Sequence, residues 1–298
     1  MSSVDESTPL GAQIARDSER ARRLATVEFA RPARTRIFTV ANQKGGVGKT
    51  TSAVNIAAAL AKQDLNVLVI DIDPQGNAST ALGVEHSTDV NSVYEVLIDE
   101  VEMSEAVVPS PDFETLWCLP ATINLAGAEI ELVSMVAREQ RLTRALQKYL
   151  QQRKDAGSPI DYVVIDCPPS LGLLTVNAFV AAREVLIPIQ CEYYALEGLS
   201  QLWNSIQQIK KHLNPSLDIS TILLTMFDGR TNLSAQVAED VRAHFPRQVL
   251  RAAIPRSVRI SEAPSYGQTV ISYEPNSSGA LSYREAAEEI AHRGANNG

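Results

Sequence analysis

The sequence predicts an α/β fold: a doubly wound, mostly parallel sheet of about seven strands with helices on both faces. Short apolar runs rich in β-branched residues alternate with helical stretches. Such continuous apolar runs are typical of parallel strands that are covered on both faces. The clearest amphipathic patterns, TTSAVNIAAALAKQ (50–63) and LSQLWNSIQQIKKHL (199–213), have the period of helices that cover a sheet.

Seven runs along the chain are predicted to be strands. They are RIFTVAN (36–42), NVLVIDID (66–73), TLWCLP (115–120), YVVIDCPP (162–169), EVLIPIQ (184–190), STILLTMFD (220–228) and VLRAAIP (249–255). We therefore expect a single domain over residues 36–298. Residues 1–35 are arginine-rich and poor in large apolar side chains, so we expect a flexible extension with helical character around Gln13–Ala25.

Composition restricts the class of protein. The chain has 298 residues, of which 45% are hydrophobic and 21% charged, as in an ordinary globular protein. No run approaches the roughly 20 apolar residues of a membrane span and the N-terminus has no signal-peptide core, so a cytoplasmic location is expected. The cysteines, like the histidines, are scattered, which favours buried thiols over disulfides or a metal centre (Cys118, Cys167 and Cys191).

Charge is unevenly distributed along the chain. The net charge is −8, yet residues 205–260 hold eight basic groups against four acidic ones, a local charge of +4. A basic face can bind phosphate backbones whatever the total charge of the protein. A solvated surface is the alternative that composition leaves open.

The segment QKGGVGK, between the first predicted strand and the first helix, has the order of a phosphate-binding loop. Glycines there let backbone N–H groups turn inward around phosphates, and the helix N-terminus adds its positive dipole. We predict that Lys49 pairs with the β- and γ-phosphates and that the Thr50 hydroxyl binds Mg²⁺. The other predicted contacts of this loop are Gly45, Gly46, Val47, Gly48 and Thr51.

Three aspartates are predicted at the carboxyl ends of strands, where an open α/β sheet places its ligands. Asp71 and Asp73 are two residues apart and so point to one side of their strand. Asp166 ends the run YVVID, which is the position of the aspartate that holds a Mg²⁺ water in P-loop enzymes. We expect Asp71 and Asp166 to support the metal. For Asp71 and Asp73, helix capping after the strand is the alternative.

The loop departs from the plain G-x-x-x-x-G-K-[ST] pattern, because Gln43 stands at its first glycine and Lys44 follows. This K-G-G-x-G-K-T form resembles the ParA/MinD group of ATPases. The resemblance implies that Lys44 reaches across a dimer interface to the phosphates of the partner's ATP, where a cation offsets the charge of two facing nucleotides. It also implies that Asp73 orients or activates the attacking water, and that CPPSLG (167–172) moves with the γ-phosphate. Simple termination of the strand by Pro168–Pro169 is the alternative for this segment.

Within that group, four stretches are similar to chromosome-partitioning ParA/Soj proteins: PATINLAGAEIEL (120–132), QCEYYALEGLSQL (190–202), LLTMFDGRTNLSAQV (223–237) and IPRSVRISEAPSYGQTV (254–270). The similarity implies an ATP-bound homodimer that binds double-stranded DNA without sequence preference through Arg230 and Arg259, with a nucleoid-associated location. By the same analogy, a ParB-type centromere-binding protein stimulates hydrolysis. Residues at the ends of two late strands would flank the adenine, namely Met226, Pro255 and Arg256.

Other branches of the group lack their signatures here. The C-terminal segment carries Glu285, Glu288 and Glu289, which an anionic membrane would repel, so stable membrane insertion is not expected. An extension of 35 residues is too short for a helix-turn-helix domain, although it could bind a polar scaffold or DNA. Two alternatives remain: a MinD-like positioning ATPase that acts without DNA, and a metabolic P-loop enzyme. The metabolic enzyme would need a substrate pocket, and the sequence shows no insertion that could form one.

Overall fold

The computed structural model describes residues 8–193 and 195–295, and its centre is an eight-stranded sheet in the order β3-β4-β2-β5-β1-β6-β7-β8. Neighbouring strands are parallel except for the antiparallel pair β3/β4. The strands are β1 (Arg36–Val40), β2 (Val67–Asp71), β3 (Val108–Pro109), β4 (Leu116–Leu119), β5 (Tyr162–Asp166), β6 (Glu184–Gln190), β7 (Asp218–Phe227) and β8 (Val249–Pro255).

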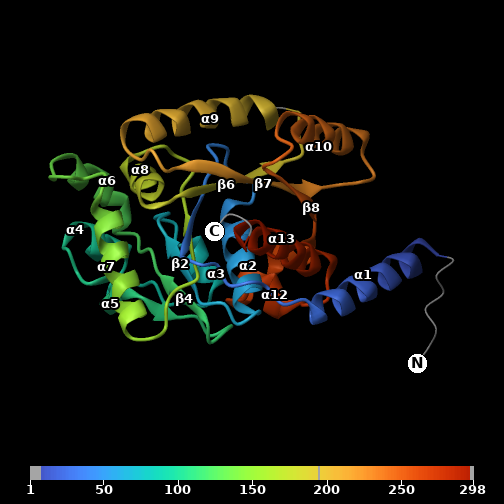
Figure 1. Ribbon diagram of the computed structural model, residues 1–298, viewed down its shortest axis with the longest axis horizontal. Helices are drawn as coiled ribbons and strands as arrows, with labels where there is room; N and C mark the ends of the chain where they lie inside the picture. The colour runs from blue at the N-terminus through green and yellow to red at the C-terminus, as the bar shows by residue number, and fades with distance from the viewer. Residues whose placement is uncertain (1–7, 194, 296–298) are drawn as a thin grey trace.

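Helices connect and cover these strands (Figure 1). They are α1 (Pro9–Thr26), α2 (Lys49–Ala61), α3 (Asn77–Ala81), α4 (Val93–Ile98), α5 (Met103–Ala106), α6 (Leu125–Val133), α7 (Arg141–Asp155), α8 (Leu173–Ala181), α9 (Ala195–His212), α10 (Asn232–His244), α11 (Val258–Glu262), the 3-10 helix η1 (Ala263–Tyr266), α12 (Val270–Tyr273) and α13 (Ser278–Ala295).

The predicted fold class is confirmed, and each of the seven predicted strands forms. The eighth strand, β3, was not predicted, because two residues are too short to show a period-two pattern. Cys118, Cys167 and Cys191 are buried free thiols, as expected.

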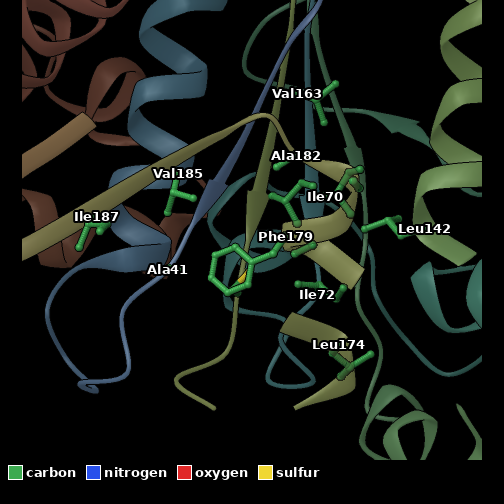
Figure 2. Packing of buried hydrophobic residues seen from close by; sticks show 14 of the residues in the cluster. Ala41, Ile70, Ile72, Leu142, Val163, Leu174, Phe179, Ala182, Val185 and Ile187 are labelled. Carbon is green, nitrogen blue, oxygen red and sulfur yellow. The ribbon is translucent and has the colours of Figure 1, made fainter. Parts of the chain in front are cut away.

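Alternation along the strands divides the buried side chains into two cores, one on each face of the sheet. Val67 and Val69 of β2 belong to the core under α2 and α13, whereas Leu68 and Ile70 belong to the core under α6 to α10. Figure 2 shows part of the second core, in which helix side chains such as Phe179 lie beside strand side chains such as Ile70. The sheet is thus covered on both faces, which explains its unbroken apolar runs.

The arginine-rich N-terminal segment contains helix α1, which includes the stretch expected to be helical. Its C-terminal half packs on α13: Leu24 is 1% exposed, Arg20 Nη2 lies 2.7 Å from Glu285 Oε2, and Arg23 Nη1 lies 2.8 Å from Glu288 Oε1. Figure 1 shows the other end of α1 projecting from the body. The described part of the extension is therefore anchored by ion pairs and by the burial of Leu24, while the division of the chain at residue 36 stays a prediction.

Both edges of the sheet are blocked. At the β8 edge, the Glu289 carboxylate accepts hydrogen bonds from the backbone N–H groups of Arg251 (2.9 Å) and Ala252 (2.8 Å). Arg293 donates to the carbonyl oxygens of Gln248 and Val249, each at 2.9 Å. The opposite edge strand, β3, has two residues and ends in a proline. Short strands, proline and covering side chains are the usual means of protecting an edge.

Candidate nucleotide site and basic surface

The register of three adjacent strands sets the geometry of the site. Asp166 at the end of β5 stands beside Asp71 at the end of β2 and beside Val40 at the end of β1. Because parallel strands end at one edge, the glycine loop after β1 and the carboxylates after β2 and β5 converge there. The structure thus brings together the loop and the aspartates that the sequence predicted.

The glycine loop is held open by contacts on both sides. Gly46 and Gly48 adopt φ values of 74° and 87°, in the left-handed region that favours glycine. The Thr225 hydroxyl donates to the carbonyl oxygen of Val47 at 2.9 Å, and the Asn42 amide donates to that of Pro188 at 2.8 Å. At Gly45 and Gly46, an added Cβ would meet no atom within 4 Å. The space beside these two exposed glycines is therefore open to a ligand such as a phosphate group.

Lys49, the first residue of α2, is enclosed in this edge. Its side chain is 7% exposed, and its Nζ donates to the carbonyl oxygen of Lys44 at 3.2 Å. Burial lowers the pKa of Lys49, while the nearby carboxylates of Asp166 and Asp73 oppose that shift. The ammonium group is thus desolvated and held within the loop, where a phosphate would be a stronger partner than a carbonyl oxygen.

Asp71 is completely buried and has a full set of donors. It accepts hydrogen bonds from the backbone N–H (2.9 Å) and hydroxyl (2.8 Å) of Ser79 and from the N–H of Asp73 (3.2 Å). Burial raises the pKa of Asp71 to about 6, in spite of the two hydrogen bonds from Ser79, which lower it. Its oxygens are therefore oriented by the protein and have little freedom to move.

Asp166 is buried to the same extent but lacks such donors. Within the described residues, neither of its carboxylate oxygens accepts a hydrogen bond of normal geometry, although the Thr50 hydroxyl is near enough to lower its pKa. Burial, followed by the charge of Asp71, nevertheless raises the pKa of Asp166 well above its usual range. A buried carboxylate without a partner calls for a cation or an ordered water.

These oxygens fit Mg²⁺. No group of three or more His, Cys, Asp or Glu in the described part of the chain could hold a metal ion by itself. Magnesium is commonly bound through one or two carboxylates together with waters and substrate phosphates, so a complete protein cage is not needed. The unpartnered Asp166 and the neighbouring Thr50 hydroxyl are suited to that role, with Asp71 beside them.

Asp73 lies just beyond β2 and is 9% exposed. Its Oδ1 accepts a hydrogen bond from the backbone N–H of Gln75 at 3.0 Å, which fixes the carboxylate in the turn that precedes α3. Asp73 and Asp166 both act on the charge of Lys49. The carboxylate therefore stands close to the place where the terminal phosphate would bind.

Lys44 differs from Lys49 although it belongs to the same loop. Its side chain is 49% exposed, and its Nζ forms an ion pair with Glu192 Oε2 at 2.8 Å. The Gln190 side-chain amide donates to the other oxygen of Glu192. The second lysine is thus held on the surface by a residue that follows β6.

The residues predicted to flank the adenine lie side by side at the ends of β7 and β8. Phe227 pairs with Pro255, and the backbone N–H of Arg256 donates to the carbonyl oxygen of Phe227 at 3.3 Å. Met226 has a positive φ of 51°, which is unusual for a side chain of its size. The positions agree with the prediction, and the adenine contact itself stays a prediction.

Arg230 and Arg259 follow the same two strands and lie outside the nucleotide loop. Arg230 is 90% exposed and pairs with Asp228 at 2.9 Å, whereas Arg259 is 55% exposed and pairs with Glu262 at 3.1 Å. The Arg230 guanidinium lowers the pKa of Asp228 to about 2. Both arginines therefore lie at the carboxyl edge of the sheet, each paired with a neighbouring carboxylate.

Several residues of the site were not predicted from the sequence. Ser79 fixes Asp71, Thr225 and Asn42 anchor the glycine loop, and Glu192 holds Lys44. Three of these contacts join segments that are distant in the chain, so no local spacing reveals them. Ser79 follows Asp71 by only eight residues, and its position could have suggested a capping contact.

The chain is similar to known proteins over most of its length. Residues 35–219 match a family model described as an AAA domain. The chain is 51% identical to the sporulation initiation inhibitor protein Soj of Bacillus subtilis over 259 residues, which cover 87% of this chain and 99% of that protein. It is 48% identical to the chromosome partitioning protein ParA of Myxococcus xanthus over 258 residues, 87% of this chain and 88% of that one.

A solved structure is also similar over most of the chain. It is described as cobyrinic acid a,c-diamide synthase from Mycobacterium smegmatis with bound ADP and magnesium. Its TM-score is 0.72 and its sequence identity 40%, over 86% of this chain and 94% of that chain. The similarity thus covers most of this chain, and the similar protein is described with a bound nucleotide and magnesium.

Proposed function

This chain belongs to the ParA/Soj family of chromosome-partitioning ATPases, and from that premise we propose that it partitions DNA by cycling between two states. In the ATP-bound state, two subunits pair and bind double-stranded DNA without sequence preference. Hydrolysis of ATP to ADP and phosphate separates the subunits and releases the DNA. The ADP and magnesium bound to the Mycobacterium smegmatis relative support ATP and Mg²⁺ as the cofactors.

The contrast between two lysines of one loop carries this proposal. Lys49 is enclosed and serves the phosphates of its own subunit, whereas Lys44 is half exposed and paired with a surface carboxylate. The Lys44 ammonium group lies on the surface beside the nucleotide loop of its own subunit. It is therefore suited to contact the nucleotide of a second subunit. Because the γ-phosphate is what differs between ATP and ADP, Lys44 would make pairing depend on the nucleotide.

The remaining residues of the edge divide the work of hydrolysis. Lys49 would bind the β- and γ-phosphates, and Thr50, Asp71 and Asp166 would support Mg²⁺. When bound, Mg²⁺ neutralises charge on the phosphate oxygens. Asp73, whose Oδ1 is fixed by Gln75, would use its other oxygen to orient the attacking water. A ParB-type centromere-binding protein is proposed to stimulate this slow step.

DNA would be bound by exchange of ion-pair partners. Arg230 and Arg259 are paired with carboxylates at the surface, and a DNA phosphate would replace each carboxylate. Contacts of this type carry no sequence information and weaken steeply as salt increases, because bound counterions are released. The local positive charge of residues 205–260 supports this assignment.

Pelleting of DNA with ATP, with ADP and without nucleotide tests the proposal. We expect the protein to pellet with DNA in ATP alone, and light scattering with a non-hydrolysable ATP analogue to report a dimer. A molecule that remains a monomer at saturating analogue would overturn the scheme. For the charge-reversal variant Arg259→Glu, the control is Arg144→Glu, which makes the same change of net charge on an exposed residue of α7.

A MinD-like ATPase that positions its cargo without DNA is the alternative. No helix in the described part of the chain is long and apolar enough to span a membrane. Co-sedimentation with liposomes in the presence of ATP separates this alternative from DNA binding, because the proposed function requires DNA and not lipid. Diamide synthesis, the activity by which the Mycobacterium smegmatis relative is described, would require a pocket for a further substrate.

A further inference from the structure

A histidine outside the predicted nucleotide site packs on the turn that follows Asp73. His86 is partly exposed and comes shortly after the end of α3. Its Nε2 lies 2.9 Å from the hydroxyl oxygen of Thr80, in the last turn of that helix. The ring also lies against Gly76, the N-cap of α3: a Cβ at position 76 would stand 2.9 Å from His86 Nδ1. His86 thus contacts both ends of this short helix.

The hydrogen bonds of Thr80 assign a role to each atom of this contact. The Thr80 hydroxyl donates its proton to the carbonyl oxygen of Gly76 at 3.1 Å. A hydroxyl has one proton, so its oxygen can only accept from any further partner. The Nε2 of His86 is therefore the donor to Thr80, which assigns the neutral imidazole its Nε2–H tautomer. The three residues form one connected chain of hydrogen bonds.

Gly76 connects this chain to Asp73. The N–H of Gly76 donates to the carbonyl oxygen of Asp73 at 2.9 Å, and the N–H of Gln75 donates to Asp73 Oδ1 at 3.0 Å. Gly76 is buried and adopts a φ of 63°, in the left-handed region that favours glycine. The imidazole of His86 occupies the space that a side chain at position 76 would need. The ring therefore limits the positions that the turn, and with it the Asp73 carboxylate, can adopt.

The same helix holds a second carboxylate of the site. Ser79 of α3 donates both its N–H and its hydroxyl to Asp71. The N–H of Val84 donates to the carbonyl oxygen of Ser79 at 3.0 Å, so the chain turns back after α3 and brings His86 to Gly76. A helix of five residues has little stability of its own, and contacts from outside it must fix its position.

We propose that His86 is a positioning residue for ATP hydrolysis, which holds the Asp73 carboxylate in place through Thr80 and Gly76. This inference rests on the proposed function in taking Asp73 as the group that orients the attacking water. Because His86 acts through other residues, its loss should slow the reaction of bound ATP. Binding of ATP depends on the glycine loop and Lys49, and should be unaffected.

Steady-state turnover of ATP with Mg²⁺ tests this inference. We expect His86→Ala to lower kcat about tenfold or more, while KM and the affinity for a non-hydrolysable ATP analogue stay within about twofold. His86→Gln retains a donor at the Nε2 position and should recover kcat to within about threefold of the unchanged protein. The control is His212→Ala, which removes an exposed histidine at the end of α9 and should change neither constant.

Two further variants examine the route from His86 to Asp73. Thr80→Val keeps the shape of the side chain and removes its hydroxyl, so it should lower kcat by a factor similar to His86→Ala. The double variant His86→Ala/Thr80→Val should be no slower than the slower single variant, because both substitutions break one connection. In an Asp73→Ala protein, His86→Ala should lower the residual turnover no further.

Three results would contradict the positioning role. One is a kcat of His86→Ala within about twofold of the unchanged protein. Another is a His86→Gln protein as slow as His86→Ala, because the retained donor should restore the contact with Thr80. The third is full additivity of His86→Ala and Asp73→Ala, which would mean that the two side chains act independently.

DNA pelleting of the same samples separates this inference from the proposed function. The His86→Ala protein should pellet with DNA in ATP as the unchanged protein does, since only hydrolysis is slowed. If the unchanged protein fails to pellet DNA while kcat still depends on His86, the positioning role stands and the DNA function falls. If pelleting requires ATP and Asp73→Ala is inactive, but His86→Ala turns over normally, the proposed function stands and this inference falls.

Discussion

Two regions of the molecule hold their charged groups in different ways. They are the nucleotide edge, which is the edge of the sheet with the glycine loop, and the basic surface, which carries Arg230 and Arg259. Asp71, Asp166 and Lys49 are buried, and Asp71 and Lys49 are held by hydrogen bonds within the edge. Arg230 and Arg259 are exposed, and each is held by one carboxylate that lies two or three residues away in the chain. The first group is fixed before any ligand arrives, whereas the second can exchange its partner at little cost.

This difference indicates how one subunit can have fixed groups for the reaction of the nucleotide and exchangeable groups for binding a further partner. Desolvated groups with fixed geometry suit a reaction that needs charge in one place. Exposed ion pairs contribute little to stability, so replacing a carboxylate by a phosphate changes the fold hardly at all. Lys44 belongs to the nucleotide loop by sequence and to the exposed group by its ion pair with Glu192.

The largest effect is expected for Asp73→Ala. Removal of the group that orients the attacking water should reduce ATP turnover by about 10²- to 10⁴-fold, while the ATP-bound dimer stays on DNA. Turnover and DNA pelleting measured together check this. Asp73→Asn retains an acceptor for the Gln75 N–H and should be equally inactive. A monomeric, unbound Asp73→Ala protein would contradict the scheme.

The next largest effect is expected for Arg259→Glu on DNA binding. A carboxylate in place of a phosphate contact should abolish DNA pelleting at moderate salt and leave ATP hydrolysis and dimerisation intact. Arg144→Glu, with the same change of charge on an exposed residue of α7, should pellet normally. Normal pelleting by Arg259→Glu would remove this residue from the DNA surface.

A moderate effect is expected for Asp71→Asn on stability. The folded-state pKa of Asp71, raised to about 6, exceeds its unfolded value, so this residue contributes stability that is lost as pH rises from about 4 through about 6. Without nucleotide, the difference in the free energy of unfolding between the variant and the unchanged protein should therefore shift in the variant's favour by at most about 3 kcal/mol between pH 4.5 and pH 7.5. Melting curves at the two pH values measure this, and a pH-independent difference would refute the assignment.

The smallest effect is expected for Glu192→Gln, which removes the carboxylate that holds Lys44. Exposed ion pairs contribute about 0.2–1 kcal/mol, so dimerisation with a non-hydrolysable ATP analogue should strengthen by no more than about fivefold. The gain should shrink as salt is added, because salt screens exposed charges. Glu105→Gln, the same change on α5, should have no effect. Weaker dimerisation of Glu192→Gln would instead give Glu192 a positive role in pairing.

Much of the nucleotide edge could be predicted from the sequence because its signals are local. The glycines, Lys49 and Thr50 lie within one loop, and Asp71 and Asp166 each end an apolar run. Parallel strands bring such ends together, so the approach of the two aspartates followed from the fold class. The same reasoning placed Pro255 beside the end of β7.

Contacts between distant segments could not be predicted in that way. The pairs Lys44–Glu192 and Thr225–Val47 join residues far apart in the chain, and no periodicity marks them. The exposure of Ile130 and Val136 could not be predicted either, because an apolar residue in or beside a helix is expected to be buried. Strand β3 was missed for lack of length.

The blocked edges of the sheet have a consequence for crowded copies of this chain. Glu289 and Arg293 occupy backbone hydrogen-bonding groups at the start of β8, and β3 offers two residues with a proline. A neighbour cannot add its own strand to either side, so growth into a continuous fibre by that route is closed. Copies that accumulate densely on a long polymer would stay separate units, each able to leave without disturbing the next.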